Sequence, residues 1–114
     1  MTTTLNNFTS ETQLTTGEVA MVSTTSSEVK YIGKATFTNT SASAVEVTVW
    51  RILIATTGTT GSGGNWLDIK TIQPGKVWVC DKIMSHVLGN VMQISALADT
   101  GSVINVNISG TTET

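Results

Sequence analysis

The sequence predicts an all-β fold, an antiparallel β-sandwich or jelly roll of about seven or eight short strands with an extended N-terminal arm. The first observation is composition, because the chain is rich in Thr, Val and Ile, and β-branched side chains suit a pleated sheet. The second is that only 12% of the residues are charged, which is too few for a disordered chain. The third is a series of short apolar or alternating stretches separated by turn residues. A chain of 114 residues buries one modest core, so we expect one sandwich domain.

Residues 1–16 are polar and weakly patterned, and we expect them to form an arm in front of a sandwich domain at residues 17–114. Such an arm is loose unless it docks on something. Three spaced apolar residues, Leu5, Phe8 and Leu14, are what docking on a partner would need. A loose tail with incidental apolar residues is the alternative, and the sequence leaves both interpretations open.

The strands of the domain are recognised from alternating and apolar stretches. Residues 29–38 alternate and place Tyr31, Ala35 and Phe37 on one face, with Ile32 as the apolar exception on the other. Residues 45–54 carry apolar side chains on both faces near their end, which is typical of a central strand covered on both sides. The expected strands are residues 18–23, 29–38, 45–54, 66–72, 77–80, 91–98 and 102–109.

Turns and loops separate these strands. Gln73-Pro74-Gly75-Lys76 has Pro and Gly in the two central positions of a type II turn. Residues 55–65 form a bland loop of Gly, Thr and Ser, which is either functional or merely tolerated. Residues 81–90 hold the one candidate for a helical turn, with Asp81 as its cap.

Charge and cysteine content exclude several classes of function. The lysines and Arg51 are scattered, so we expect no nucleic-acid partner. We also expect no membrane partner, because the sequence has neither a polybasic patch nor an apolar run long enough for a membrane-spanning helix. The start of the chain lacks the pattern of a secretory signal. Cys80 is the single cysteine, so no internal disulfide can form.

The sharpest catalytic candidate is Asp99-Thr100-Gly101, which follows an apolar strand in the way that retroviral-type aspartic proteases present one carboxylate of a shared dyad. Only residues 102–114 follow it, which leaves no room for the flap hairpin and the later apolar segment of such an enzyme. A β-turn is the better interpretation, because Asp99 and Gly101 are natural turn residues. We therefore expect no catalytic residues and no enzyme activity.

Cys80 and His86 are the other candidates for chemistry, as a thiol–imidazole pair or as metal ligands. A tetrahedral zinc site needs three or four ligands, and the chain has one Cys and one His. Cys80 alternates with Trp78 on an expected strand, which favours a small core residue. We expect no metal and no cofactor.

Three tryptophans, Trp50, Trp66 and Trp78, stand out in a chain with few aromatic residues. Tryptophan in a small sandwich is usually a core residue, and we expect core positions here. Trp66 is the best candidate for an exposed ring, because it ends the loop at residues 55–65. Glycoside hydrolysis would need two facing carboxylates, and the acidic residues are scattered over turns and strand edges.

Several segments follow one another over roughly residues 35 to 110: Thr38–Val45 leading into a strand, the Gly-rich loop, Ile72–Lys76, Val91–Ala96 and Val106–Gly110. In order and spacing, these segments resemble small virion proteins of tailed bacteriophages. Proteins of this group look like β-sandwich pieces of phage particles, and they bring no catalytic motif.

The resemblance implies a capsid decoration, or cement, protein that stabilises the head by bridging subunits of the major capsid protein or another virion protein. The bridge would use edge strands or the arm at residues 1–16. A homo-oligomer, with a trimer favoured, and a place on the capsid surface after assembly in the host cytoplasm are further implications. The alternative is a tail or tail-fibre component, such as a receptor- or glycan-binding knob, which predicts an exposed Trp66 beside the loop at residues 55–65.

Overall fold

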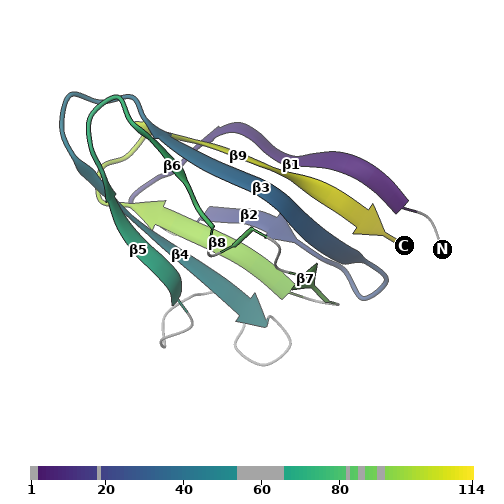
Figure 1. The fold of residues 1–114 in the computed structure, drawn as a ribbon. Coiled ribbons are helices and arrows are strands. Elements are labelled where there is room, and N and C mark those ends of the chain that lie inside the picture. Colours follow the sequence, from purple (N-terminus) through teal and green to yellow (C-terminus); the bar gives the residue numbers. More distant parts are fainter. Residues whose placement is uncertain (1–2, 18, 54–65, 82, 85–86, 90–91) are drawn as a thin grey trace.

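Two antiparallel β-sheets pack face to face in the computed structural model (Figure 1). The structure describes residues 3–17, 19–53, 66–81, 83–84, 87–89 and 92–114. The all-β sandwich expected from the sequence is confirmed, with nine strands in the described part of the chain instead of seven or eight. These are β1 (Thr3–Gln13), β2 (Val19–Ser23), β3 (Val29–Asn39), β4 (Val45–Leu53), β5 (Trp66–Ile72), β6 (Val77–Val79), β7 (Val87–Leu88), β8 (Met92–Ala98) and β9 (Ile104–Glu113).

The strand order within the sheets is that of a jelly roll. Sheet A has the order β1–β9–β3–β6, with the short β7 also paired to β3, and sheet B has the order β2–β8–β4–β5. β1 therefore pairs with β9, β2 with β8, β3 with β6 and β4 with β5. Strands from the two ends of the chain pair inward toward the middle, like one long hairpin folded across two sheets.

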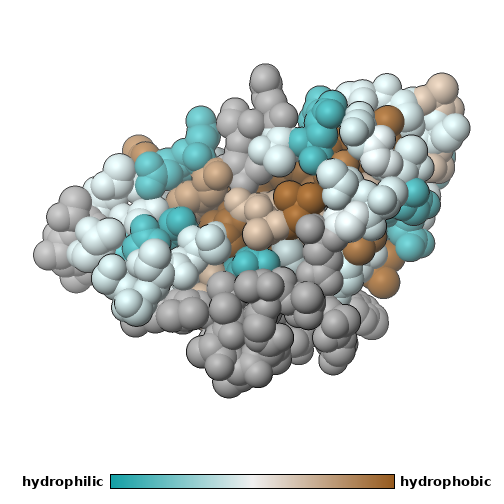
Figure 2. Space-filling view, turned by 180° about the vertical axis from the view of Figure 1, so that it is seen from behind, coloured by the Kyte–Doolittle hydropathy of each residue, from teal (hydrophilic) through white to brown (hydrophobic). Residues whose placement is uncertain are grey.

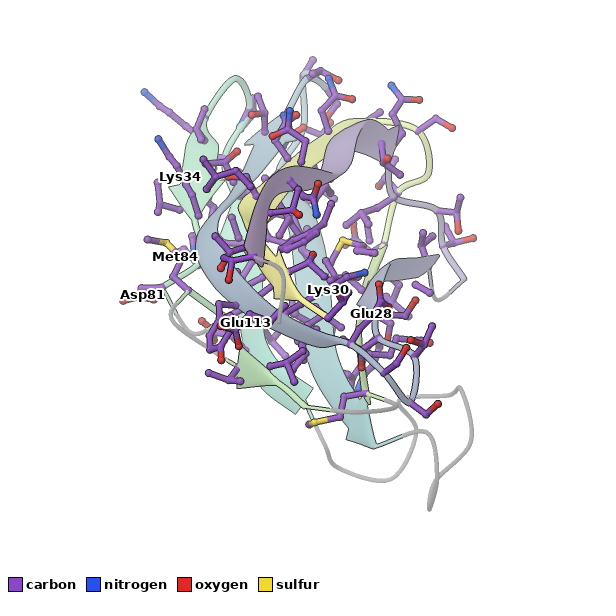
Figure 3. The ribbon with its side chains drawn as sticks, turned by 90° about the vertical axis from the view of Figure 1, so that its right-hand side faces the viewer. Glu28, Lys30, Lys34, Asp81, Met84 and Glu113 are labelled. Atoms are coloured by element: carbon purple, nitrogen blue, oxygen red, sulfur yellow. The ribbon has the colours of Figure 1, made fainter. Side chains whose placement is uncertain are left out.

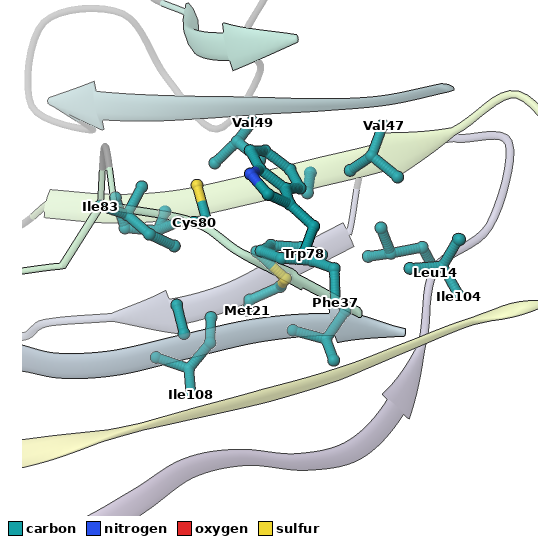
Figure 4. Packing of buried hydrophobic residues seen from close by; sticks show 14 of the residues in the cluster. Leu14, Met21, Phe37, Val47, Val49, Trp78, Cys80, Ile83, Ile104 and Ile108 are labelled. Carbon is teal, nitrogen blue, oxygen red and sulfur yellow. The ribbon is translucent and has the colours of Figure 1, made fainter. Parts of the chain in front are cut away.

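The core lies between the sheets and follows from strand alternation (Figure 4). Val45, Val47 and Val49 of β4 are completely buried, because every second side chain of that strand faces sheet A. On the other side, the Phe37 ring of β3 lies against the Trp78 ring of β6, with 5.1 Å between the ring centroids. The two aromatic rings thus hold the short β6 to the sheet by side-chain packing as well as by backbone pairing.

The expected N-terminal arm is an edge strand of the sandwich. β1 pairs with β9 from Thr3 opposite Glu113 to Gln13 opposite Asn105. Leu14 follows it into the core, where its side chain is completely buried and its N–H donates to the Ile104 carbonyl oxygen at 3.0 Å. Two register shifts interrupt the pairing and reset the alternation of side chains. These shifts explain why the segment shows no strand pattern in the sequence.

β3 also departs from simple alternation, at Gly33. Its pairing with β9 shifts register between Ile32 and Lys34, so that Ile32 is buried and Tyr31 points outward. The expectation that Tyr31 shares the inner face with Ala35 and Phe37 is therefore wrong. Gly110 of β9 lies opposite this shift, and a Cβ there would overlap the Tyr31 carbonyl oxygen. The close approach of β3 and β9 thus requires glycine at residue 110.

The turn that joins β5 to β6 is the expected type II turn. Gly75 has a φ of 71°, and the Lys76 N–H donates to the Gln73 carbonyl oxygen at 3.1 Å. The side chain of Asn39, which is almost completely buried, donates to the Ile72 carbonyl oxygen at 2.8 Å. This hydrogen bond ties the end of β5 to the end of β3.

The helical turn expected within residues 81–90 covers only the start of that range. The N–H groups of Ile83 and Met84 donate to the Cys80 carbonyl oxygen at 3.4 and 3.3 Å, which makes a single turn. β7 follows at Val87–Leu88 and pairs with β3, and the described residues contain no helix. Within those residues there is accordingly no helix long and apolar enough to cross a membrane.

Candidate contact surface

The three apolar residues expected to dock on a partner have three different environments. Leu5 is 83% exposed on β1 and is free to make a contact. Phe8 is half-buried against the core, with the Lys30 ammonium 5.3 Å from its ring centroid. Leu14 is a core residue, so its assignment as a contact residue is corrected. Of the three, only Leu5 has the exposure that a partner contact needs.

An exposed apolar border runs along one side of the outer face of sheet A. Val77 and Val79 of β6 lie opposite Thr38 and Thr36 of β3, and they point away from the core because Trp78 between them points into it. Val87 of β7 lies opposite Tyr31 in the same sheet. We call the side chains with this placement the apolar border: Tyr31, Val77, Val79 and Val87, which are 38%, 58%, 48% and 45% exposed.

The sequence reasoning missed this border. The alternation of Val77 and Val79 around the larger Trp78 is the signal that could have found it, because a strand that buries Trp78 must turn both valines outward. Figure 3 shows Asp81 and Met84, which lie between β6 and β7 in the sequence, on the same side of the molecule as Lys34 of β3. Charged side chains therefore accompany the apolar border, as they do at the rim of protein contact surfaces.

A groove of about 440 Å³ adjoins the apolar border, between the ends of β5 and β6. Ile72 and Trp78 line it with largely buried apolar side chains. Lys70 and Lys76 also line it, and among the described residues they are the charged ones. The other described residues that line it are Thr71, Gln73, Val77 and Val79.

Two shallow hollows of about 360 and 310 Å³ lie over β1, β9 and β3. Asn7 and Ser109 line both of them. Leu5 also lines the first hollow and Ile108 the second, so both hollows combine polar and apolar surface. Seen from behind, the molecule also shows apolar residues gathered in the middle with hydrophilic ones around them (Figure 2).

The residues considered for catalysis have structural roles where the structure describes them. Asp99 lies in the turn before β9, and its carboxylate accepts hydrogen bonds from the Glu46 N–H at 3.2 Å and the Thr100 hydroxyl at 3.3 Å. Cys80 is completely buried in the core, as expected for a small core residue. His86 lies outside the described residues. Across the described ranges, no three His, Cys, Asp or Glu side chains come together as a metal site would require.

Trp78 and Trp50 occupy different positions in the sandwich. Trp78 belongs to the core between the sheets, as predicted. Trp50 is also buried, but it lies opposite Ser95 of β8 on the outer face of sheet B. The side chain of Trp66, the candidate for an exposed ring, and the loop at residues 55–65 lie outside the part of the molecule that the structure describes.

The geometry thus defines a jelly-roll domain whose exposed features are an edge strand, an apolar border and a groove. Neither the comparison with protein-family models nor the comparison with curated proteins gives a match. Among solved structures, the fold is similar to part of a chain in the structure of infectious bursal disease virus Gt strain, with 9% sequence identity and a TM-score of 0.33. The match covers 96% of this chain and 30% of that one, so this chain spans less than a third of the viral chain. A similarity at this level does not bear on function.

Proposed function

We propose that this protein is a structural component of a tailed-bacteriophage particle, a capsid decoration protein that stabilises the head by bridging capsid subunits. The observation that carries the proposal is the apolar border of sheet A. Four exposed apolar side chains on one border favour a protein partner, because apolar surface of this kind is stabilised when a partner covers it. The sequence resemblance to phage virion proteins supports the choice of partner.

The architecture suits this function. Jelly rolls serve as capsid and lectin domains, and both act by contact. In the described part of the chain β1 and β6 are the outer strands of sheet A, and they carry the exposed Leu5 on one edge and Val77 and Val79 on the other. A protein that presents contact residues at opposite edges of one sheet can touch two neighbouring subunits at once. We propose that the protein bridges them in this way, without catalysis.

Particle occupancy tests the proposal. In particles of the phage that encodes this chain, we expect the protein in a copy number comparable with that of the major capsid protein, measured by quantitative mass spectrometry. The double variant Val77→Ser, Val79→Ser should reduce that occupancy by about tenfold or more, since it removes central apolar contacts. Ile69→Ser is the matched control, because Ile69 is 44% exposed but lies on β5 of sheet B.

Three results would contradict the proposal. Absence of the protein from particles would exclude a virion role altogether. Equal occupancy of the double variant and the wild type would exclude the apolar border as the contact surface. A copy number far below that of the capsid protein would place the protein in the tail and replace the decoration role.

A glycan-binding knob on a tail fibre is the second candidate, favoured by the two hollows over β1, β9 and β3. The amide of Asn7 and the hydroxyl of Ser109 line both hollows, and such groups can pair with sugar hydroxyls. A glycan array probed with the purified protein tests this candidate. Binding that is lost in Asn7→Ala would support it, and an array without signal would remove it.

A further inference from the structure

Some backbone N–H and C=O groups of β6 have no backbone partner among the residues that the structure describes. The Lys76 carbonyl oxygen accepts from the Asn39 N–H, and the Cys80 N–H donates to the Ala35 carbonyl oxygen, both at 3.0 Å. In an antiparallel pair, every second residue turns its N–H and C=O toward the partner strand and the residues between turn theirs away. Val77 and Val79 are the residues between, so their peptide groups point away from β3.

One of these outward groups is already engaged. The Val79 carbonyl oxygen accepts a hydrogen bond from the Asp81 N–H at 3.0 Å. The N–H and C=O of Val77 and the N–H of Val79 are therefore the groups that β6 directs toward its open edge. An extended peptide is the partner whose backbone matches such a row of groups.

The charged residues that line the groove indicate which charge the peptide should carry. Within the part of the chain that the structure describes, the charged residues that line it are Lys70, on β5, and Lys76, at the end of the turn. Asp68 lies two residues before Lys70 and does not line the groove, and its carboxylate accepts the Ile69 N–H at 2.9 Å. A ligand with a carboxylate is thus complementary to the groove, whereas a basic ligand would meet like charges.

The exposed valines of β6 add a second requirement. Val77 and Val79 point to the outer face of sheet A, whereas Trp78 between them points inward and lines the groove. An apolar side chain that alternates with the acidic one would therefore lie on the outer face, beside Val77 or Val79. Alternation of this kind is the natural pattern of a strand, because its successive side chains point to opposite faces.

We propose that the groove between β5 and β6 binds an extended, acidic segment of a protein partner, which adds to sheet A as a strand beside β6. The segment hydrogen-bonds to Val77 and Val79, and its carboxylate lies near Lys70 and Lys76. An apolar side chain of the segment, on the opposite face from its carboxylate, lies beside Val77 and Val79. This inference rests on the proposed function, because it assigns the class of segment that a capsid subunit contributes to the contact.

Peptide titration followed by amide chemical shifts tests the inference on the full-length protein. The probe is acetyl-Thr-Val-Glu-Val-Glu-Val-Thr-amide, and the matched control replaces both Glu with Lys. We expect the acidic peptide to shift the amide signals of Val77 and Val79 and the indole signal of Trp78. It should bind about tenfold more tightly than the basic peptide and more weakly as salt is raised.

Charge reversal provides the sharper comparison. The double variant Lys70→Glu, Lys76→Glu should reverse the preference between the two peptides, while Lys70→Arg, Lys76→Arg should retain it. Unchanged thermal unfolding shows that both variants are folded. Equal binding of the two peptides, shifts confined to β1, or no shifts at all would each overturn the inference.

The outcome separates the inference from the proposed function. If the acidic peptide does not bind but the protein is abundant on particles, the function stands and the groove is not the contact. If the peptide binds as expected but the protein is absent from particles, the groove is a peptide site and the partner is not a capsid subunit.

Discussion

The Tyr31 hydroxyl donates a hydrogen bond to Oε2 of Glu113 at 3.0 Å, which ties the start of β3 to the last residue of β9. Tyr31 is directly opposite Thr111, so the bond runs diagonally across the two strands. The same end of sheet A carries the Lys30 ammonium, which donates to the Ser23 carbonyl oxygen at 2.6 Å (Figure 3). Side-chain bonds therefore support the end of the molecule where both chain termini lie (Figure 1).

The pKa of Tyr31 should lie above the ordinary tyrosine value of 10.0 in the folded protein. The hydrogen bond to Glu113, its negative charge and partial desolvation all favour the neutral phenol. Tyr31 is the single tyrosine of the chain, so alkaline titration of the phenolate absorbance reports this residue alone. Glu113→Gln should lower the pKa toward 10.0.

The sign of the pH effect on stability follows from the direction of this pKa shift. A folded-state pKa above the unfolded one means that the contribution of Tyr31 to stability is complete below about pH 10 and is lost as the pH rises through the folded-state pKa. Wild type and Glu113→Gln should therefore converge in stability at strongly alkaline pH. A wild-type phenol that titrates at or below 10.0 would contradict the hydrogen bond.

Gly110→Ala should destabilise the protein by about 1–3 kcal/mol, because β3 and β9 must separate to admit the new methyl group. The methyl group would overlap the Tyr31 carbonyl oxygen and press on Phe8. Urea denaturation measures the loss. Gly101→Ala is the matched control, since nothing lies within 4 Å of its added Cβ, and it should change stability little. Equal stabilities for the two variants would show that the strands do not approach so closely.

Leu14→Ala should cost about 2–5 kcal/mol of unfolding free energy, because it empties a fully buried core position. Leu5→Ala should cost less than about 0.5 kcal/mol, because Leu5 is exposed and its loss leaves no cavity. Thermal or urea unfolding of the two variants compares them directly. A Leu14→Ala variant as stable as Leu5→Ala would mean that residues 1–16 are a detachable arm after all.

The role of β1 in the sheet changes how partner binding must be tested. Deletion of residues 2–16 would remove an edge strand and a core side chain, so it would unfold the domain as well as remove a contact. Substitutions at exposed residues such as Leu5 and Val77 separate the two effects, because neither side chain supports the core. For the same reason, peptide binding in the groove is best tested by changing the charges of Lys70 and Lys76.

Local chemistry made part of the fold predictable. The type II turn follows from Pro74 and Gly75 alone, since their allowed φ values match its two central positions. The strand from Val45 follows from three alternating valines that the structure buries completely. Cys80 and Trp78 could be assigned to the core because both are large or apolar enough to gain from burial on an alternating strand.

The candidate site was much less predictable. The outward position of Tyr31 depends on the register shift at Gly33, which alternation by itself cannot show. The groove brings together Lys70 of β5 and Trp78 of β6, which lie on either side of a turn. These two strands belong to different sheets, so the groove forms only when both sheets are in place. Leu14 was expected at the surface because the residues before it are mostly polar. An edge strand has such a polar sequence because one of its sides is open to solvent.

The sequence by itself determined the class of fold and the positions of most strands, because β-branched alternation and turn residues act over a few neighbouring residues. The tertiary structure decided which strands lie side by side and which faces remain exposed. Those choices depend on pairing between distant parts of the chain, such as β1 with β9, and on register shifts that turn a side chain from one face to the other. The contact surface arises from these long-range choices, so it became visible only in the folded molecule.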